Sequence, residues 1–302
     1  MQLTTSRRSS VSEGRIAVIG AGTMGSQIAQ QAALHGYSVS LYDERPEQLV
    51  RALESNRGHL QRRVDKGTLS PLEFDAALAI VEPFDNLAEA VAGCSLVIEA
   101  IIEDLGAKQA LFQQLDMLAE PDVLLATNTS SMTVSQITSI LPNRDRTLAL
   151  HFFNPVLVMQ LVEIAPAPYS RAGLVQQAEA FVISIDRTPV VLEREIEGML
   201  ANRIIAAIRR EAFWLVGQGF ATPEAIDQAI ELGLRHPMGP FRLADFNGLD
   251  VVMAIQQRRF ERTGDELDRP PAQLKELVDQ GKLGRKTGSG FYVYDLPREG
   301  SN

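Results

Sequence analysis

The sequence predicts an α/β fold in which a doubly wound, mostly parallel sheet is followed by a second, smaller all-α domain. Three observations predict it. A strand–glycine turn–helix–strand unit lies near the N-terminus, short apolar segments alternate with helix-forming or turn-forming sequence, and apolar residues recur at helical spacing in the C-terminal third. At 302 residues, the chain is long enough for two unequal domains.

The N-terminal unit carries the strongest fold signal. RIAVIG is a short apolar run that stops at Gly20, SQIAQQAALHG carries helix formers up to Gly36, and YSVSLYD is a second strand ending in an acid. A strand–helix–strand crossover of this kind requires a parallel sheet. A fold of the Rossmann class is therefore expected.

The rest of the chain continues this pattern. Residues 45–79 are expected to form a helical hairpin that breaks near Gly67 and Pro71. LAIVEPF, CSLVIEAI, VLLATNTSS and TLALHFF then extend the sheet, VMQLVEIAPAP looks antiparallel, and TPVVLE closes the domain. We expect a disordered leader at residues 1–13, a dinucleotide-binding domain at 14–192 and a helical domain at 193–302.

Composition excludes several partners and sites. The formal net charge of −9 argues against nucleic acid and anionic membranes as partners, because both would repel the chain. No run reaches the roughly 18 apolar residues of a membrane helix, and MQLTTSRRSSVSEG lacks the apolar region of a secretory signal. A cytoplasmic protein is expected, with organelle targeting as an open alternative. The single Cys94 fits a reducing compartment, and no metal-ligand spacing occurs.

A glycine motif between the first strand and the first helix predicts a dinucleotide site. GAGTMG matches G-x-G-x-x-G, in which the glycines permit a tight turn, a close approach of the pyrophosphate and close helix packing. The N-H groups at the helix N-terminus favour a diphosphate. The predicted binding residues are Gly20, Gly22, Thr23, Met24 and Gly25.

Asp43 predicts which dinucleotide is bound. It ends the second strand about 20 residues beyond the glycines, where an acid contacts the ribose hydroxyls of NAD and repels the 2′-phosphate of NADP. Two readings stay open, since Asp43 also suits a helix cap and Arg45 suits a 2′-phosphate. NAD is the expected cofactor.

HFFNP and QLVEI predict a site for proton transfer. His151 ends a strand, and if the chain turns back at Asn154 and Pro155, Glu163 meets it across neighbouring strands. A carboxylate on one imidazole nitrogen fixes the tautomer and leaves the other nitrogen to take the proton of an alcohol. A structural histidine is the alternative, and His236 is the only rival base.

TNTSS adds polar groups after another strand, at the same expected edge of the sheet. Asn128, Ser130 and Ser131 are suited to bind a substrate oxygen. Alternatively, the hydroxyls of Ser130, Ser131 and Thr133 cap the helix that follows. The absence of a GxSxG motif counts against a serine hydrolase.

Seven ordered motifs resemble those of one family. IGAGTMG, EAIIEDLGAK, TNTSS, HFFNPV with LVEI, ANR, HPMGPF and GKLGRKTGSGFYVY follow one another as in the L-3-hydroxyacyl-CoA dehydrogenases of the bacterial 3-hydroxybutyryl-CoA type. The resemblance covers nearly everything after the leader. It implies an acyl-CoA substrate, a helical domain that closes over the acyl chain, and a homodimer.

The resemblance also implies individual roles. His151 is the expected general base, Glu163 orients it, and Ser130 and Asn202 bind the substrate's hydroxyl or thioester oxygen; the residues implied on the cofactor side are Glu103, Lys108, Asn128 and Asn154. Without the resemblance, Asn202 and Arg203 are merely polar positions on a core-facing helix.

Some positions depart from the family. Leu157 and Gln160 stand where proline and lysine are frequent, and Met199 and Leu200 replace phenylalanine and isoleucine, which leaves the shape of the acyl pocket open. A basic stretch in the hairpin suits CoA phosphates or a solvated helix face equally well: Arg57, Arg62, Arg63 and Lys66.

The expected function is reversible, NAD-dependent oxidation of a 3-hydroxyacyl-CoA to the 3-oxoacyl-CoA. The first alternative is a dehydrogenase of a free polar hydroxy acid, against which HFFNPV argues. The second is a dinucleotide-binding protein without turnover, which the retained Ser130, His151, Glu163 and Asn202 disfavour.

Overall fold

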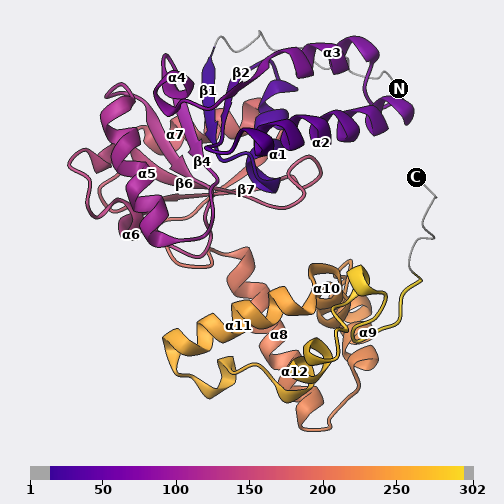
Figure 1. Ribbon diagram of the computed structural model, residues 1–302. Coiled ribbons are helices and arrows are strands. Elements are labelled where there is room, and N and C mark those ends of the chain that lie inside the picture. The colour runs from indigo at the N-terminus through magenta and orange to yellow at the C-terminus, as the bar shows by residue number, and fades with distance from the viewer. Residues whose placement is uncertain (1–13, 296–302) are drawn as a thin grey trace, which may run out of the picture. The chain divides into compact units, whose positions relative to one another are not determined.

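The computed structural model describes residues 14–295, drawn in colour in Figure 1. They form two compact units that divide between Leu200 and Ala201, called here unit 1 and unit 2. The expected leader at residues 1–13 lies outside the described residues. No helix within residues 14–295 has both the length and the apolar character to cross a membrane.

Unit 1 is built on an eight-stranded sheet in the described part of the chain. Its strand order is β3-β2-β1-β4-β5-β6-β7-β8, and all neighbours are parallel except β6 and β7. The strands are β1 (Arg15–Ile19), β2 (Ser38–Tyr42), β3 (Val81–Phe84), β4 (Leu96–Glu99), β5 (Leu124–Thr127), β6 (Thr147–Phe152), β7 (Leu161–Pro166) and β8 (Thr188–Val191). The predicted Rossmann-type sheet, including its antiparallel addition, is confirmed.

Helices cover both faces of this sheet (Figure 1). Successive residues of β1 alternate between two apolar clusters. Ile16 and Val18 belong to one with residues of α1 (Thr23–Ala33) and α7 (Leu174–Ser184), while Ala17 and Ile19 belong to another with residues of α4 (Leu87–Val91) and α5 (Leu105–Leu118). Burial on both faces explains why these strands read as continuous apolar runs. The helices are α1 (Thr23–Ala33), α2 (Pro46–Asp65), α3 (Pro71–Ala79), α4 (Leu87–Val91), α5 (Leu105–Leu118), α6 (Val134–Thr138) and α7 (Leu174–Ser184), with a 3-10 turn η1 (Arg144–Arg146).

The expected helical hairpin is present as α2 and α3. Gly67 follows α2 with a φ of 68°, a conformation that glycine adopts readily, and Pro71 opens α3. Ser70 caps α3 by accepting from the N-H of Glu73 while the Glu73 carboxylate accepts from the N-H of Ser70, which satisfies two helix-end donors.

Unit 2 is helical, as predicted. Its helices are α8 (Ala201–Gly217), α9 (Pro223–Gly233), α10 (Pro240–Asn247), α11 (Leu249–Thr263) and α12 (Ala272–Asp279), with 3-10 turns η2 (Glu266–Asp268) and η3 (Arg285–Thr287). Phe213, Phe241 and Phe291 form an aromatic group in its core, with ring centroids 4.8 to 5.7 Å apart.

Two buried aspartates join the HPMGPF and GSGFYVY motifs. Asp227 on α9 accepts from the N-H of Phe241 (2.9 Å) and from the hydroxyl of Tyr292 (2.7 Å). Asp245 on α10 accepts from the N-H groups of Phe291 and Tyr292, both at 3.0 Å. Both aspartates are fully buried. These motifs therefore hold unit 2 together, a role that the resemblance did not specify.

The two units divide later than the expected boundary at residue 192. The segment after β8 stays attached to unit 1 because its polar groups bind there: Glu195 accepts from the N-H of Ser135 (2.9 Å), and the N-H of Gly198 donates to the carbonyl of Ser130 (2.6 Å). The N-H of Leu200 donates to Glu163 (3.0 Å). These contacts are long-range, so the end of the last strand alone could not indicate them.

Candidate active site

The glycine turn between β1 and α1 is shaped for a close ligand. Gly20 has a φ of 105°, and a Cβ there would lie 2.6 Å from the carbonyl of Ala100; a Cβ on Gly25 would overlap the carbonyl of Gly20. Beside Gly22 there is open space, and no side chain caps α1, which begins with Thr23 and Met24. The first N-H groups of α1, which no side chain caps, are suited to bind a diphosphate.

Asp43 is tied to that turn. Its Oδ2 accepts from the N-H of Ala21 (2.9 Å), and its Oδ1 accepts from the N-H of Arg45 (3.0 Å). Asp43 does not cap a helix, because α2 begins at Pro46 with Arg45 as its N-cap. The Arg45 guanidinium lies 3.5 Å from the Asp43 carboxylate, which partly neutralises its positive charge. The carboxylate is thereby held beside the glycine turn.

His151 and Glu163 are directly opposite each other on the antiparallel strands β6 and β7. The imidazole Nδ1 lies 2.9 Å from Glu163 Oε2, and Glu163 Oε1 accepts from the N-H of Leu200 (3.0 Å). The two side chains are 10% and 1% exposed. Phe153 packs on the imidazole with ring centroids 4.5 Å apart. With Nδ1 bonded to the carboxylate, Nε2 is the nitrogen left for a substrate.

The loop between β5 and α6 brings further polar groups to this edge of the sheet. Asn128 Oδ1 accepts from the N-H of Phe152 (2.8 Å), which ties the end of β5 to the strand that carries His151. Thr133, not Ser130 or Ser131, caps α6, since its hydroxyl accepts from the N-H of Gln136. The helix-cap alternative is therefore confirmed for Thr133 and wrong for Ser130 and Ser131.

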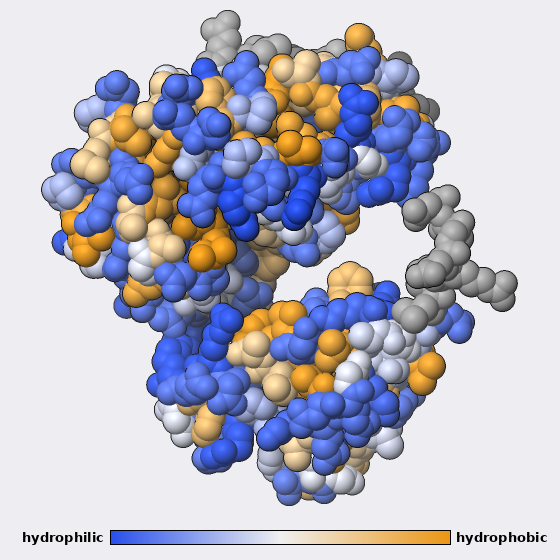
Figure 2. Space-filling view, viewed as in Figure 1, coloured by the Kyte–Doolittle hydropathy of each residue, from blue (hydrophilic) through white to orange (hydrophobic). Residues whose placement is uncertain are grey.

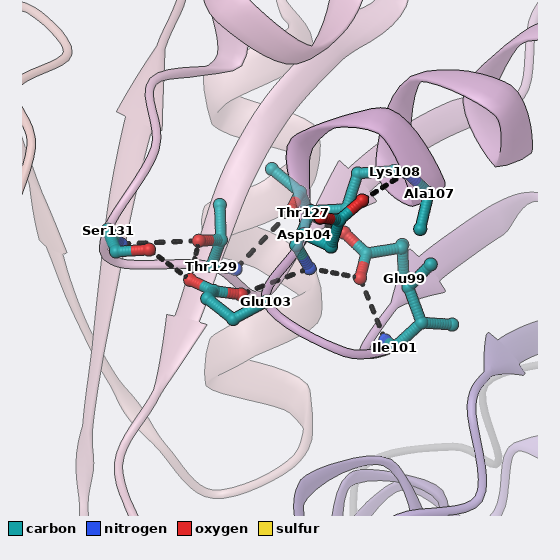
Figure 3. A network of polar contacts seen from close by, with 9 residues as sticks. All are labelled: Glu99, Ile101, Glu103, Asp104, Ala107, Lys108, Thr127, Thr129 and Ser131. Atoms are coloured by element: carbon teal, nitrogen blue, oxygen red, sulfur yellow. Dashed lines mark hydrogen bonds and ion pairs between the residues drawn. The ribbon is translucent and has the colours of Figure 1, made fainter. Parts of the chain in front are cut away.

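A buried ionic network supports the same loop (Figure 3). The Lys108 ammonium on α5 lies 2.5 Å from Glu99 Oε1 and 3.2 Å from Glu103 Oε2. Glu99, the last residue of β4, also accepts from the hydroxyl of Thr127 (2.6 Å) and from the N-H of Ile101 (2.8 Å). The ends of β4 and β5 and the start of α5 are thus joined through two carboxylates and one ammonium.

The expected role of Lys108 on the cofactor side of the cleft stays a prediction, and the structure places its side chain inside the network. Its side chain is 1% exposed because Glu99, which is fully buried, holds it inside unit 1. Glu103 is the open member of the network, with 36% of its side chain exposed. Sequence reasoning missed Glu99, although a charged residue inside the apolar run SLVIEAI was a usable signal.

The network keeps Glu103 ionised. Burial by itself raises the pKa of this carboxyl, but the charge of Lys108 and the hydroxyls of Ser131 and Thr129 outweigh it, so that the net pKa lies below the ordinary value of 4.5.

Three further predicted residues come from other parts of the chain. Asn154 is exposed just after β6. Asn202 lies in the first turn of α8, and His236 lies in the loop between α9 and α10, so both belong to unit 2. The role of Asn202 toward a substrate stays a prediction.

Comparison with known proteins decides the family. Residues 15–196 match the NAD binding domain of 3-hydroxyacyl-CoA dehydrogenase, and residues 198–294 match the C-terminal domain of the same enzyme. The chain belongs to the 3-hydroxyacyl-CoA dehydrogenase family. The two domain models meet near the end of unit 1, which agrees with a division after residue 192.

Similar proteins of this family align with nearly the whole chain. It is 37% identical to the probable 3-hydroxybutyryl-CoA dehydrogenase of Bacillus subtilis over 93% of this chain and 97% of that protein. Its structure is similar to the crystal structure of 3-hydroxybutyryl-CoA dehydrogenase from Escherichia coli, with a TM-score of 0.88 and 37% identity over 95% of this chain; the match spans 61% of that longer chain. The (S)-3-hydroxybutyryl-CoA dehydrogenase of Ralstonia eutropha matches with a TM-score of 0.86 and 33% identity, covering 94% of this chain and 100% of that one.

These findings confirm the family, the fold class and an NAD-dependent oxidoreductase. The residues present also fit NAD: the space beside Gly22, the uncapped start of α1 and the carboxylate of Asp43 match its diphosphate and ribose.

Proposed function

We propose that the protein oxidises an L-3-hydroxyacyl-CoA to the 3-oxoacyl-CoA, reversibly and with NAD, and that His151 is the general base. The observation that carries this proposal is the buried His151–Glu163 pair, with its 2.9 Å bond, at the carboxyl-terminal edge of the sheet that also bears the glycine turn. The names of the relatives support the acyl-CoA substrate.

Residues of unit 1 bind and orient the cofactor. The backbone of Gly22, Thr23 and Met24 holds the diphosphate, and Asp43 accepts from the ribose hydroxyls. The cofactor supplies a hydride acceptor at its nicotinamide ring. Four further residues belong to the cofactor side of the site: Glu103, Lys108, Asn128 and Asn154.

His151 moves the proton. Its Nε2 takes the proton of the substrate's C3 hydroxyl as the hydride leaves C3, and the resulting imidazolium is stabilised by Glu163 at Nδ1. Glu163 is itself fixed by the N-H of Leu200, so the ring orientation is set before the substrate binds. Ser130 and Asn202 bind the hydroxyl or thioester oxygen.

The basic stretch of the hairpin suits the CoA phosphates. Arg57 and Arg62 are exposed on α2, Arg63 is partly exposed there, and Lys66 is exposed just after the helix. Exposed guanidinium groups pair readily with phosphate, and their charge offsets the overall negative charge of the chain.

The protein is proposed to be a cytoplasmic homodimer that binds neither nucleic acid nor membrane. Large apolar side chains stand exposed on unit 2, as the orange patches in Figure 2 illustrate, and a second copy would bury such surface. Examples are Phe220, Leu232, Leu234, Ile255 and Val293, with exposed fractions from 53% to 89%. Light scattering of the purified protein tests the dimer, because a monomeric mass at micromolar concentration contradicts it.

A substrate panel tests the reaction. Oxidation of NADH is followed by absorbance with acetoacetyl-CoA, longer 3-oxoacyl-CoA esters and free 3-oxo acids at equal concentration. We expect turnover with the CoA esters and little with the free acids. The opposite preference supports the free hydroxy-acid alternative, and NADH binding without any turnover supports a non-catalytic protein.

A further inference from the structure

One carboxylate oxygen contacts both neighbours of Ser130. Glu103 Oε1 accepts a hydrogen bond from Ser131 Oγ (2.6 Å) and another from Thr129 Oγ1. Thr129 is 3% exposed, and its hydroxyl also accepts from the N-H of Ser131 (3.2 Å). The turn that carries Ser130 is therefore closed on itself and fastened to Glu103 on either side of the serine.

The carboxylate that fastens this turn is itself anchored. Glu103 Oε2 lies 3.2 Å from the Lys108 ammonium, which the fully buried Glu99 holds at 2.5 Å. Glu99 also binds Thr127, the last residue before the turn begins (Figure 3). The contacts form a closed frame that runs from the end of β5 through β4 and α5 and back to the residues flanking Ser130.

We propose that Glu103 is a positioning residue that sets the Ser130 hydroxyl for the substrate, an inference that rests on the function proposed above for Ser130. A loop serine can adopt several rotamers and backbone positions, and only a small part of them directs its hydroxyl at a given oxygen. A displacement of about 1 Å can cost up to about 10²-fold in rate.

The positioning role of Glu103 can be tested without disrupting the buried Glu99–Lys108 pair of unit 1. Glu99 and Lys108 form their 2.5 Å pair without Glu103, so the buried ammonium keeps a counter-charge when Glu103 is neutralised. Ser131 is exposed, and the hydrogen bond from its hydroxyl to Glu103 lies at the surface. Removal of either group loosens the turn while the buried pair remains.

The experiment is a double-mutant cycle between the frame and Ser130. The frame is weakened by Ser131→Ala, by Thr129→Val and by Glu103→Gln, each made alone and in a Ser130→Ala background. Ser135→Ala on α6, outside the frame, is the matched control. We measure kcat, the KM of acetoacetyl-CoA, the dissociation constant of NADH by fluorescence, and the melting temperature.

The expected result is a loss of kcat of about 10- to 100-fold from the frame variants, with Ser135→Ala at the parental rate. In the Ser130→Ala background, the same frame substitutions should cost less than about threefold, because they act through the missing hydroxyl. Ser131→Ala and Thr129→Val should leave the dissociation constant of NADH unchanged, since both keep the Glu103 carboxylate.

Two results overturn the inference. In one, the frame variants retain parental kcat; in the other, their losses multiply with that of Ser130→Ala, which assigns the frame a separate role. Full activity of Ser130→Ala refutes the role of Ser130 and this inference together. The Ser130→Ala variant shows this by itself, without the frame variants. If Thr129→Val lowers the melting temperature markedly, its kcat is set aside. The kcat of Ser131→Ala, at an exposed position, then decides whether the inference holds.

Discussion

The acid behind the proposed base offers a sharp test of the site. Glu163 is 1% exposed, and its two oxygens accept from different donors: Oε2 lies 2.9 Å from His151 Nδ1, and Oε1 lies 3.0 Å from the N-H of Leu200. In Glu163→Gln one of these oxygens becomes an N-H₂ group. If the N-H₂ group faces His151, it meets the proton on Nδ1 unless the imidazole changes tautomer. If it faces Leu200, it meets the backbone N-H.

The size of the effect follows from this geometry. If the amide N-H₂ faces His151, the ring must present a bare Nδ1 and carry its proton on Nε2, where it cannot accept the substrate's proton. In an analogous carboxylate–histidine pair, a forced wrong tautomer lowers kcat by about 10⁴. If the amide turns the other way, the N-H of Leu200 loses its hydrogen bond to a charged acceptor, at a cost of about 1.5–3 kcal/mol.

We therefore expect Glu163→Gln to lower kcat by roughly 10³- to 10⁴-fold while NADH binding is retained. The assay combines initial rates of acetoacetyl-CoA reduction with NADH fluorescence and thermal denaturation. Glu195→Gln is the matched control, because Glu195 binds only the backbone N-H of Ser135 among the contacts described. A folded Glu163→Gln protein with kcat within tenfold of the parent would refute the reasoning.

Three further outcomes follow from other parts of the molecule. Asp43→Asn keeps an oxygen for the N-H of Ala21 but removes the charge that repels a 2′-phosphate, so the ratio of kcat/KM for NADP to that for NAD should rise at least about tenfold; an unchanged ratio contradicts this. Because the pKa of Glu103 is lowered on folding, its ionised form stabilises the protein above the unfolded pKa, and that contribution is lost as the pH falls through the folded value. The difference in free energy of unfolding between parent and Glu103→Gln should therefore be constant above about pH 6 and shrink in acid, as urea titrations at several pH values can test. A Cβ on Gly290 would overlap the carboxylate of Asp245, so Gly290→Ala should destabilise unit 2 by about 1–3 kcal/mol, whereas Gly233→Ala on α9 meets open space and should not, as calorimetry can compare.

Much of the fold could be predicted because its signals are local. The strands β1 and β4 are buried on both faces, so each reads as an apolar run, and Gly67 with Pro71 marks a helix end and a helix start in sequence alone. The domain boundary was harder to predict. It depends on Glu195, Gly198 and Leu200 binding back to unit 1, and no local pattern encodes those contacts.

Some contacts of the site could likewise be predicted, and others could not. The His151–Glu163 contact could be foreseen because both residues stand on consecutive strands joined by a short turn. The burial of Lys108 could not, because it depends on Glu99, which reaches it from another element nine positions earlier in the chain. A charge in an apolar run indicates that a partner exists, but only the packed structure shows which partner it is.

One measurement tests the proposed proton transfer most directly. It is the rate constant of NADH formation in a single turnover of His151→Ala with a saturating 3-hydroxyacyl-CoA. The imidazole with Glu163 at Nδ1 is the only base we assign to this step. We predict a fall of about 10²- to 10⁴-fold with unchanged NADH affinity. Formation of NADH at the parental rate in this variant would contradict the central claim, since the hydroxyl proton would then leave without the ring.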